Sequence, residues 1–248
     1  MLPKVIFFDL MGTCCDWLSS LLPLLHTLPA HPSLAPKDDK FHALALAWRE
    51  GFFEEIHTRF NAGLEQEDID VTHRRVLDRL LLDRGIGLDV WDDDVRVKLV
   101  QQWHVQVPWP DVLPALTSLR KKSNVFLIVL ANGTTRLQLD IASSTQIPFH
   151  TLFSSQLLGY TKPDPRIYQR AMGLVGVQPE ECVMLASHVY DLKAAKGVGM
   201  RTVYVRRESE DVGLVVEEGY GVDVLVDGTG GGVDGGFGEA VRRIWEEE

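Results

Sequence analysis

Residues 5–13, Val-Ile-Phe-Phe-Asp-Leu-Met-Gly-Thr, decide the fold of this 248-residue chain. The apolar run Val5–Phe8 has no polar alternation, which is typical of a parallel strand buried on both faces. The run ends on Asp9, and a tight turn through Gly12 and Thr13 follows. In an open parallel sheet the reactive crevice lies just beyond the carboxyl ends of the strands. We therefore expect Asp9 to lie at such a crevice, as a nucleophile, a general base or a metal ligand.

Further apolar runs have the length of strands, and helical patterns lie between them. The strand-like runs are Val125–Leu130, Thr151–Phe153, Cys182–Leu185, Arg201–Val205 and Val222–Val226. The helical patterns are Val112–Lys121, Thr135–Ser143, Pro165–Leu174 and Asp191–Gly197. This alternation predicts the α/β fold class, with a doubly wound, Rossmann-like parallel sheet.

The long gap after the first strand does not fit that rhythm. It contains only amphipathic helical patterns, at Trp17–Leu28, Lys40–Arg59, Thr72–Leu82 and Asp92–Val105. A βα connection usually takes a few residues and one helix, so about ninety residues here indicate an inserted helical cap. We expect an α/β core domain of residues 1–14 and 108–248 and a helical cap domain of residues 15–107. The Gly-rich stretch Gly228–Gly238 predicts a flexible loop before a short final helix.

Composition excludes several classes of partner. The formal net charge is −10 and no Lys/Arg cluster offsets it, so we expect no nucleic-acid partner. No stretch approaches the ~20 apolar residues of a membrane span, so we expect no membrane association. The first apolar run is too short for a cleavable signal. Three cysteines form no disulfide framework, and a cytoplasmic location is therefore expected.

Three motifs in a fixed order resemble the haloacid dehalogenase superfamily. They are Asp9-x-x-Gly12-Thr13, the segment Lys162-Pro163-Asp164-Pro165-x-x-Tyr168, and Asp191 after a later strand. Together they are far more specific than any one of them alone. The resemblance covers nearly the whole chain, including the helical cap, and it implies a hydrolase with Asp9 as nucleophile.

Two positions separate this chain from most members, which are magnesium-dependent phosphatases. Those enzymes usually carry a second Asp two places after the nucleophile, where this chain has Met11. They also carry a metal-binding Asp four places before the last motif Asp, where this chain has Ser187. Met11 cannot transfer a proton as that second Asp does as general acid, and Ser187 lacks the carboxylate oxygens that Mg²⁺ prefers, so both changes weaken a phosphatase interpretation. A phosphatase, a non-catalytic binding protein on the same fold, and a hydrolase of another activated carbon or carbonyl centre stay as alternatives.

The details are more similar to the 2-haloacid dehalogenase (type II) branch, which lacks the second Asp and needs no metal or other cofactor. The branch has Ser-Asn-Gly after the second strand, where this chain has Ala131-Asn132-Gly133, and an Arg on the cap, matching Arg49. This chain departs from the branch at Ala131, at Ala186 in place of Ser, and at His188 in place of Asn. The resemblance implies hydrolytic dehalogenation of a short 2-haloalkanoic acid to the 2-hydroxy acid, and the branch often forms homodimers.

The chemistry assigns roles to these positions. The predicted catalytic residues are Asp9, which attacks carbon, Thr13, which orients it, Lys162, which keeps it ionised, and Asp191, which activates water. The predicted substrate- and halide-binding groups are Arg49, Asn132, Tyr168 and the backbone N–H groups of Leu10 and Met11. His188 and Ser187 are predicted supports, with His188 bonded to Asp191 or a loop carbonyl. The structural alternatives are a surface ion pair for Arg49, a turn for Asn132, a core contact for Tyr168 and a helix N-cap for Asp191.

Overall fold

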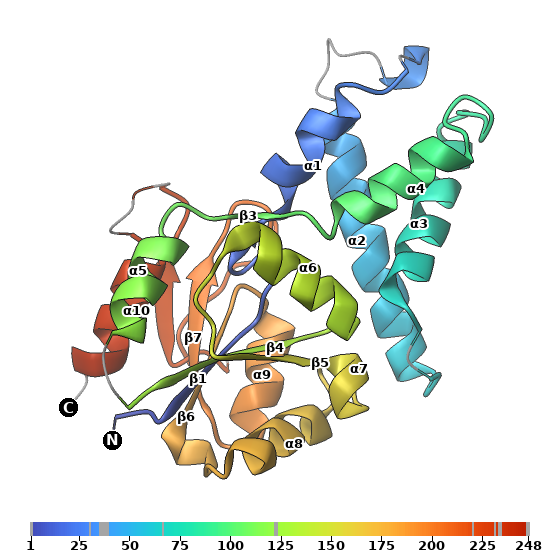
Figure 1. The fold of residues 1–248 in the computed structure, drawn as a ribbon. Coiled ribbons are helices and arrows are strands. Elements are labelled where there is room, and N and C mark those ends of the chain that lie inside the picture. The colour runs from blue at the N-terminus through green and yellow to red at the C-terminus, as the bar shows by residue number, and fades with distance from the viewer. Residues whose placement is uncertain are drawn as a thin grey trace. The chain divides into compact units, whose positions relative to one another are not determined.

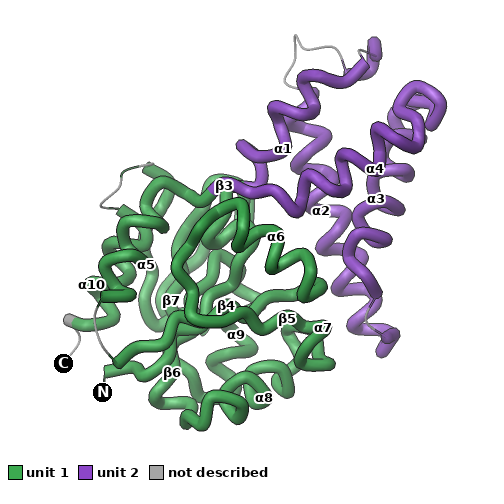
Figure 2. Tube along the Cα trace, viewed as in Figure 1, with its two compact units in different colours: residues 1–16, 108–248 green, residues 17–107 purple. Residues whose placement is uncertain are grey.

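The computed structural model describes residues 2–29, 31–34, 40–65, 67–121, 124–219, 221–230, 232 and 235–246. The chain divides into two compact units (Figure 2). Unit 1 consists of residues 1–16 and 108–248, and unit 2 consists of residues 17–107. The chain therefore leaves unit 1 once, shortly after its first strand, and returns to it once.

Unit 1 contains a six-stranded sheet in the order β5-β4-β1-β6-β7-β8, with every neighbouring pair parallel. Its strands are β1 (Val5–Phe8), β4 (Phe126–Ala131), β5 (Thr151–Ser154), β6 (Cys182–Ala186), β7 (Arg201–Arg206) and β8 (Val224–Asp227). The predicted α/β class with a doubly wound parallel sheet is confirmed.

The position of β1 explains why its last residue matters. From β1 the chain builds outward through β4 and β5 on one side and through β6, β7 and β8 on the other. β1 therefore lies at the switch point of the sheet, where ligands bind in open α/β folds. Asp9 follows β1 directly, and its backbone N–H donates to the carbonyl of Leu185 on β6 at 3.0 Å.

Helices cover both faces of the sheet (Figure 1). Alternate residues of each strand point to opposite faces, so both faces carry side chains against which helices can pack. Val5 and Phe7 belong to a buried cluster with residues of α8 (Pro165–Val175) and α9 (Val189–Gly197). Phe8 points the other way and stacks on Phe237 of α10, with the ring centroids 6.0 Å apart. The remaining helices of unit 1 are α5 (Val112–Arg120), α6 (Thr135–Thr145) and α7 (Ser155–Leu158), and α10 spans Phe237–Glu246.

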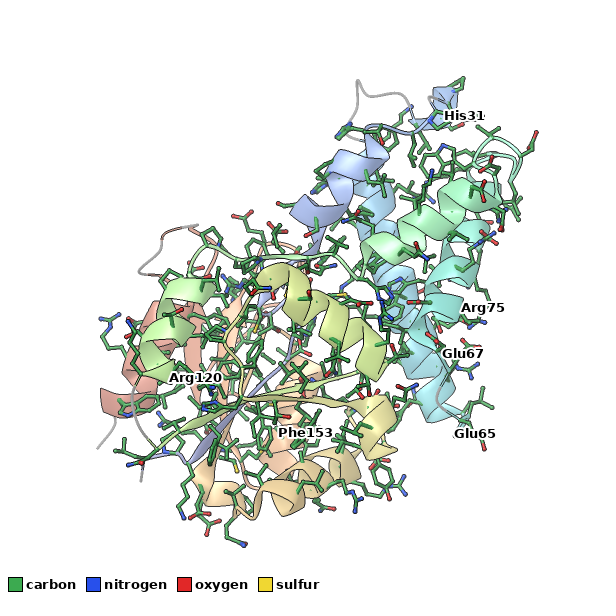
Figure 3. All side chains as sticks on the ribbon, in the orientation of Figure 1. His31, Glu65, Glu67, Arg75, Arg120 and Phe153 are labelled. Carbon is green, nitrogen blue, oxygen red and sulfur yellow. The ribbon has the colours of Figure 1, made fainter. Side chains whose placement is uncertain are left out.

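Unit 2 is built from helices α1 (Trp17–Leu25), α2 (Lys40–Asn61), α3 (Ile69–Asp83) and α4 (Asp93–Gln102), with a 3₁₀ turn at Pro32–Leu34. The two-residue strands β2 (Cys15–Asp16) and β3 (Val107–Pro108) lie where the chain leaves unit 1 and where it returns to it. Trp48, Trp91 and Trp103 are fully buried and form much of the core of unit 2. Charged side chains pair on its surface, as the labelled Glu67 and Arg75 do at 2.5 Å (Figure 3).

Local sequence explains the ends of these helices. Asp92 caps α4 by accepting a hydrogen bond from the N–H of Val95, and Asp68 caps α3 in a similar way. Because of that cap, α3 begins at Ile69, before the predicted start at Thr72. Part of the predicted glycine loop, residues 231, 233 and 234, lies outside the described residues. Among the helices that the structure describes, none combines the length and the apolar character that a membrane crossing requires.

Candidate active site

The carboxylate of Asp9 is the centre of a buried polar cluster in unit 1. Its Oδ1 accepts a hydrogen bond from Lys162 Nζ at 2.9 Å. Its Oδ2 accepts one from Thr13 Oγ1 at 2.7 Å and faces Nδ1 of His188 at 3.1 Å. Burial alone would raise the pKa of Asp9, but the charge of Lys162 and the contact with His188 outweigh it. The pKa of Asp9 is held well below its usual range, so the side chain is an anion.

Thr13 is oriented by the strand end next to β1. The backbone N–H of Ser187 donates to Thr13 Oγ1 at 2.9 Å, so the single proton of this hydroxyl points to Asp9. The Oγ of Ser187 itself donates to the carbonyl of Val205 at 2.6 Å. Ser187 therefore supports the site through its main chain, while its hydroxyl is used within the sheet.

The turn after Asp9 brings the main chain of Leu10 and Met11 to the same strand end. The carbonyl of Leu10 accepts hydrogen bonds from the N–H groups of Cys14 and Cys15, which closes the turn. Gly12 has φ of +84°, a left-handed conformation that glycine adopts without strain. The side chain of Leu10 is buried and that of Met11 is partly buried. The predicted binding role of their backbone N–H groups stays a prediction.

Lys162 joins Asp9 to Asp191. Its ammonium lies 2.5 Å from Asp191 Oδ2, and both side chains are fully buried. Burial lowers the pKa of Lys162, but the two carboxylates raise it above the ordinary value, so the ammonium keeps its charge. Burial and the negative charge of Asp9 raise the pKa of Asp191, while Lys162 opposes that shift. A carboxylate with a raised pKa is a suitable base for a water molecule.

Tyr168 contacts Asp191. Its hydroxyl donates to Asp191 Oδ1 at 2.6 Å, and the whole side chain is buried on α8. The sequence predicted a substrate contact for Tyr168. The structure gives its hydroxyl to Asp191, because α8 packs that hydroxyl against the first turn of α9, and the predicted substrate contact stays a prediction. Tyr168 therefore orients the carboxylate of Asp191.

Asn132 holds the main chain that carries Lys162. Its Oδ1 accepts from the Lys162 N–H at 2.8 Å, and its Nδ2 donates to the Lys162 carbonyl at 3.2 Å. This two-point contact fixes the loop after α7 against the end of β4. The structure therefore shows a role that the turn interpretation missed, and the predicted halide contact of Asn132 stays a prediction.

His188 and Glu210 form the part of the cluster that differs most from expectation. His188 Nε2 lies 2.5 Å from Glu210 Oε2, and both side chains are almost completely buried. The predicted bond of His188 to Asp191 or a loop carbonyl is wrong, because the ring bridges Asp9 and Glu210. Burial lowers the pKa of His188, but the Glu210 charge and the two hydrogen bonds raise it to about 10. The ring is thus an imidazolium that donates to both carboxylates.

Glu210 was missed by sequence reasoning. It lies in the charged segment Arg206–Asp211 after β7, which is typical of an exposed loop. Its carboxylate, however, is buried above the turn that follows Asp9. A run of charged residues directly after a strand at the catalytic edge of the sheet is the one signal that could have pointed to it.

Arg49 belongs to unit 2 and is described within that unit. It lies on α2 and is only 5% exposed. Its guanidinium packs over the rings of Phe53 at 4.4 Å, Trp17 at 5.6 Å and Trp103 at 5.9 Å. Arg49 is therefore not the exposed surface residue of the structural alternative. A cation held among aromatic rings is a chemically suitable partner for an anion.

The donor set does not fit Mg²⁺, the ion that the phosphatase alternative requires. All four carboxylate oxygens of Asp9 and Asp191 already face Lys162, Thr13, His188 or Tyr168. Two of these partners are cations, which a divalent ion would have to displace. Among the described residues, no group of three His, Cys, Asp or Glu side chains is arranged to hold a metal ion. The three cysteines are free and buried.

Comparison with known proteins identifies the family. The model for haloacid dehalogenase-like hydrolases matches residues 3–199. The chain therefore belongs to the haloacid dehalogenase-like hydrolases and is an enzyme of that superfamily, as the motifs predicted.

Individual relatives include dehalogenases and phosphatases. The chain is 25% identical to (S)-2-haloacid dehalogenase 1 of Pseudomonas sp. (strain CBS-3), over 82% of this chain and 85% of that protein. It is 32% identical to a glyceraldehyde 3-phosphate phosphatase of Methanopyrus kandleri, over 54% of this chain and 60% of that protein's length. The crystal structure of a defluorinating L-2-haloacid dehalogenase matches with a TM-score of 0.80 and 26% identity, covering 98% of this chain and 95% of that one. These two 2-haloacid dehalogenases match most of the length of this chain, and this phosphatase matches about half of it.

Proposed function

We propose that this enzyme removes the halogen from a short 2-haloalkanoic acid by hydrolysis, through a covalent ester on Asp9. The observation that carries the proposal is the state of Asp9. It is an anion buried between an ammonium and a hydroxyl donor, at the switch point of the sheet. Such a carboxylate is oriented for attack and needs no deprotonation first.

In the first step a carboxylate oxygen of Asp9 attacks C2 of the substrate. The new C–O bond forms as the carbon–halogen bond breaks, and the halide leaves with the bonding pair. Lys162 remains protonated throughout, and the negative charge of Asp9 is lost as the ester forms, while the halide carries one negative charge away. The backbone N–H groups of Leu10 and Met11 are the proposed donors to the substrate carboxylate, since successive N–H groups in a turn bind anions.

In the second step water attacks the Cγ of Asp9. Asp191 lies next to Lys162 and has a raised pKa, so we assign it as the base that takes the water proton. The tetrahedral intermediate then collapses. The bond between Cγ and the ester oxygen breaks, and Asp191 returns the proton to the leaving alkoxide of the 2-hydroxy acid. The second proton of the water leaves Asp9 for solvent, which restores the Asp9 carboxylate. Both steps use only side chains of the enzyme and water, so the proposal includes no metal or other cofactor.

A phosphatase is the second candidate, because a glyceraldehyde 3-phosphate phosphatase is among the relatives. Two features argue against it. Met11 cannot protonate a leaving group, and the carboxylates of Asp9 and Asp191 are bound to cationic and hydroxyl donors. A binding protein without turnover is less well supported, since the nucleophile, the ammonium and the base are all present in hydrogen-bonding contact.

Halide release in the presence of a chelator separates these candidates. The enzyme is incubated with each enantiomer of 2-chloropropionate in EDTA, and free chloride is followed. A parallel assay contains Mg²⁺ and a generic phosphate monoester. The proposal predicts chloride release that EDTA leaves unchanged and no phosphate release above background. Magnesium-dependent phosphate release without chloride release would contradict it.

A further inference from the structure

The two oxygens of Asp9 have different surroundings. Oδ1 accepts a hydrogen bond from the ammonium of Lys162 at 2.9 Å. Oδ2 faces two donors, the hydroxyl of Thr13 at 2.7 Å and the Nδ1 of His188 at 3.1 Å. An oxygen with two donors directed at it is a poorer nucleophile and is better suited to hold negative charge. This asymmetry assigns the attack to Oδ1 and leaves Oδ2 as the carbonyl oxygen of the ester.

A hydrogen bond to the other nitrogen of the His188 ring fixes the direction of its Nδ1 donor. Glu210 accepts from Nε2 of the ring at 2.5 Å, so Nδ1 is fixed toward Asp9. Glu210 also packs directly on the turn after the nucleophile. A Cβ atom on residue 12 would lie 2.3 Å from Cδ of Glu210. The carboxylate therefore fits at this position only because residue 12 is glycine. Ser209 donates a hydrogen bond to the other oxygen of Glu210 at 3.3 Å.

Resting on the proposed function, we propose that His188 and Thr13 form the oxyanion site for hydrolysis of the Asp9 ester, with Glu210 as the positioning residue that fixes the His188 ring. When water adds to Cγ, the π electrons of the ester carbonyl move onto Oδ2. That oxygen then carries a full negative charge, and the imidazolium N–H and the Thr13 hydroxyl point at it. Both donors are already in place before the charge develops, which is the condition for strong electrostatic stabilisation.

The same contacts act differently in the two half-reactions. During alkylation the negative charge of Asp9 is consumed, so a donor on Oδ2 gives little help and slightly restrains the nucleophile. During hydrolysis the charge on Oδ2 appears, so the donor stabilises the transition state. Loss of His188 should therefore slow hydrolysis of the ester far more than its formation. A merely structural role for His188 would slow both steps together.

The charged groups around the ring set its protonation. The ring faces Asp9 after β1, Glu210 on the loop after β7, and the ring of Tyr190 on α9, with a centroid separation of 5.8 Å. Asp211 lies on the same loop as Glu210, and its carboxylate also feels the charge of His188. In the Glu210→Gln variant the main negative partner of His188 is neutral, so the pKa of His188 should fall. The rate of ester hydrolysis should then begin to change with pH at a lower pH than in the wild type.

Rapid-mixing experiments with 2-chloropropionate and excess enzyme separate the two steps. Chloride release reports formation of the ester, and the mass of the Asp9 peptide reports its decay. For His188→Ala we expect chloride release within a few-fold of the wild type and ester decay slower by about 10²- to 10³-fold, so the ester accumulates. His188→Asn, which keeps a neutral N–H donor, should recover part of the lost hydrolysis rate.

Controls keep the outcome unambiguous. Glu208→Gln removes the same charge from the same loop at an exposed position, and it should leave both steps unchanged. Thermal unfolding of each variant establishes that it is folded, and His188→Asn serves if His188→Ala is not. Equal slowing of both steps, or ester decay at the wild-type rate in a folded His188 variant, would overturn the inference while leaving the proposed function intact. A wild-type enzyme that neither releases chloride nor gains mass would contradict the proposed function and therefore also this inference.

Discussion

The ammonium of Lys162 lies 2.9 Å from Oδ1 of Asp9, although 153 positions separate the two residues in the chain. The sheet brings them together, because Asp9 ends the central strand and Lys162 lies on the loop held to the end of β4 by Asn132. The ammonium of Lys162 also contacts Asp191, the proposed base, at 2.5 Å. One ammonium thus lies between two carboxylates and offsets part of their mutual repulsion.

Replacing Lys162 with Met should therefore destabilise the fold as well as abolish activity. The variant leaves the buried carboxylate of Asp191 without its counter-charge and removes one of the two cations that face Asp9, which costs about 3–5 kcal/mol of the free energy of unfolding. Urea unfolding at neutral pH measures that loss. The deficit should shrink at low pH, where one of the carboxylates is protonated. A deficit that does not change with pH would show that lost packing, and not charge, is responsible.

Tyr168→Phe removes a single hydroxyl from Asp191. Since the ring stays in place, the loss of stability should be small, about 1 kcal/mol. The activity should fall more, and mainly in hydrolysis of the ester, because Asp191 is the base for that step. Steady-state halide release together with the mass of the Asp9 peptide checks this. Unchanged ester decay would reduce Tyr168 to a core residue.

Stability at high pH should depend on the His188–Glu210 pair. Burial lowers the pKa of His188, but Glu210 and the hydrogen bonds to Asp9 and Glu210 raise it from 6.5 to about 10. A folded-state pKa above the unfolded value gives stability that is complete below about pH 6.5 and is lost as the pH rises toward 10. The loss is on the order of 5 kcal/mol for this shift.

Unfolding free energies of the wild type and Glu210→Gln across this pH range test that expectation. Glu210→Gln should be less stable at neutral pH, and its loss with rising pH should be smaller, because its His188 pKa is lower. The pKa shift of His188 acts between about pH 6.5 and pH 10. An unfolding free energy of the wild type that stays constant from about pH 7 to pH 10 would contradict a charged His188.

Arg49→Ala should reduce turnover more than it reduces stability. Contacts of a guanidinium with aromatic rings are worth about 0.5–2 kcal/mol each, so some loss of unfolding free energy is expected. If Arg49 also receives the departing halide, turnover should fall by a larger factor than that loss explains. Arg79→Ala, an exposed change on α3, is the matched control. Unchanged turnover in folded Arg49→Ala would make it a purely structural residue.

The sheet could be predicted because buried parallel strands leave a simple signature. The run Val5–Phe8 and the later runs are short, apolar and followed by polar residues, and all of them became neighbouring strands. The contacts of Lys162 with Asp9 and Asp191 followed from the same rule, since residues at the carboxyl ends of parallel strands meet at one edge.

The partners of individual side chains could not be predicted in the same way. Glu210 is buried only because Gly12 lacks a side chain, and that fit depends on three-dimensional packing. His188 therefore bonds Glu210, and the sequence-based expectation for its partner was wrong. Tyr168 is similar, because the rotation of α8, and not the spacing to Lys162, decides that its hydroxyl reaches Asp191.

The most direct test of covalent catalysis is the mass of the Asp9 peptide after a brief incubation with 2-chloropropionate in EDTA. The account predicts that wild-type enzyme carries the 1-carboxyethyl group on Asp9 and that the group disappears as the 2-hydroxy acid forms. Asp9→Asn should carry no such group and release no chloride above background. Halide release by the wild type with a modification on another residue, or sustained release by Asp9→Asn, would contradict the account.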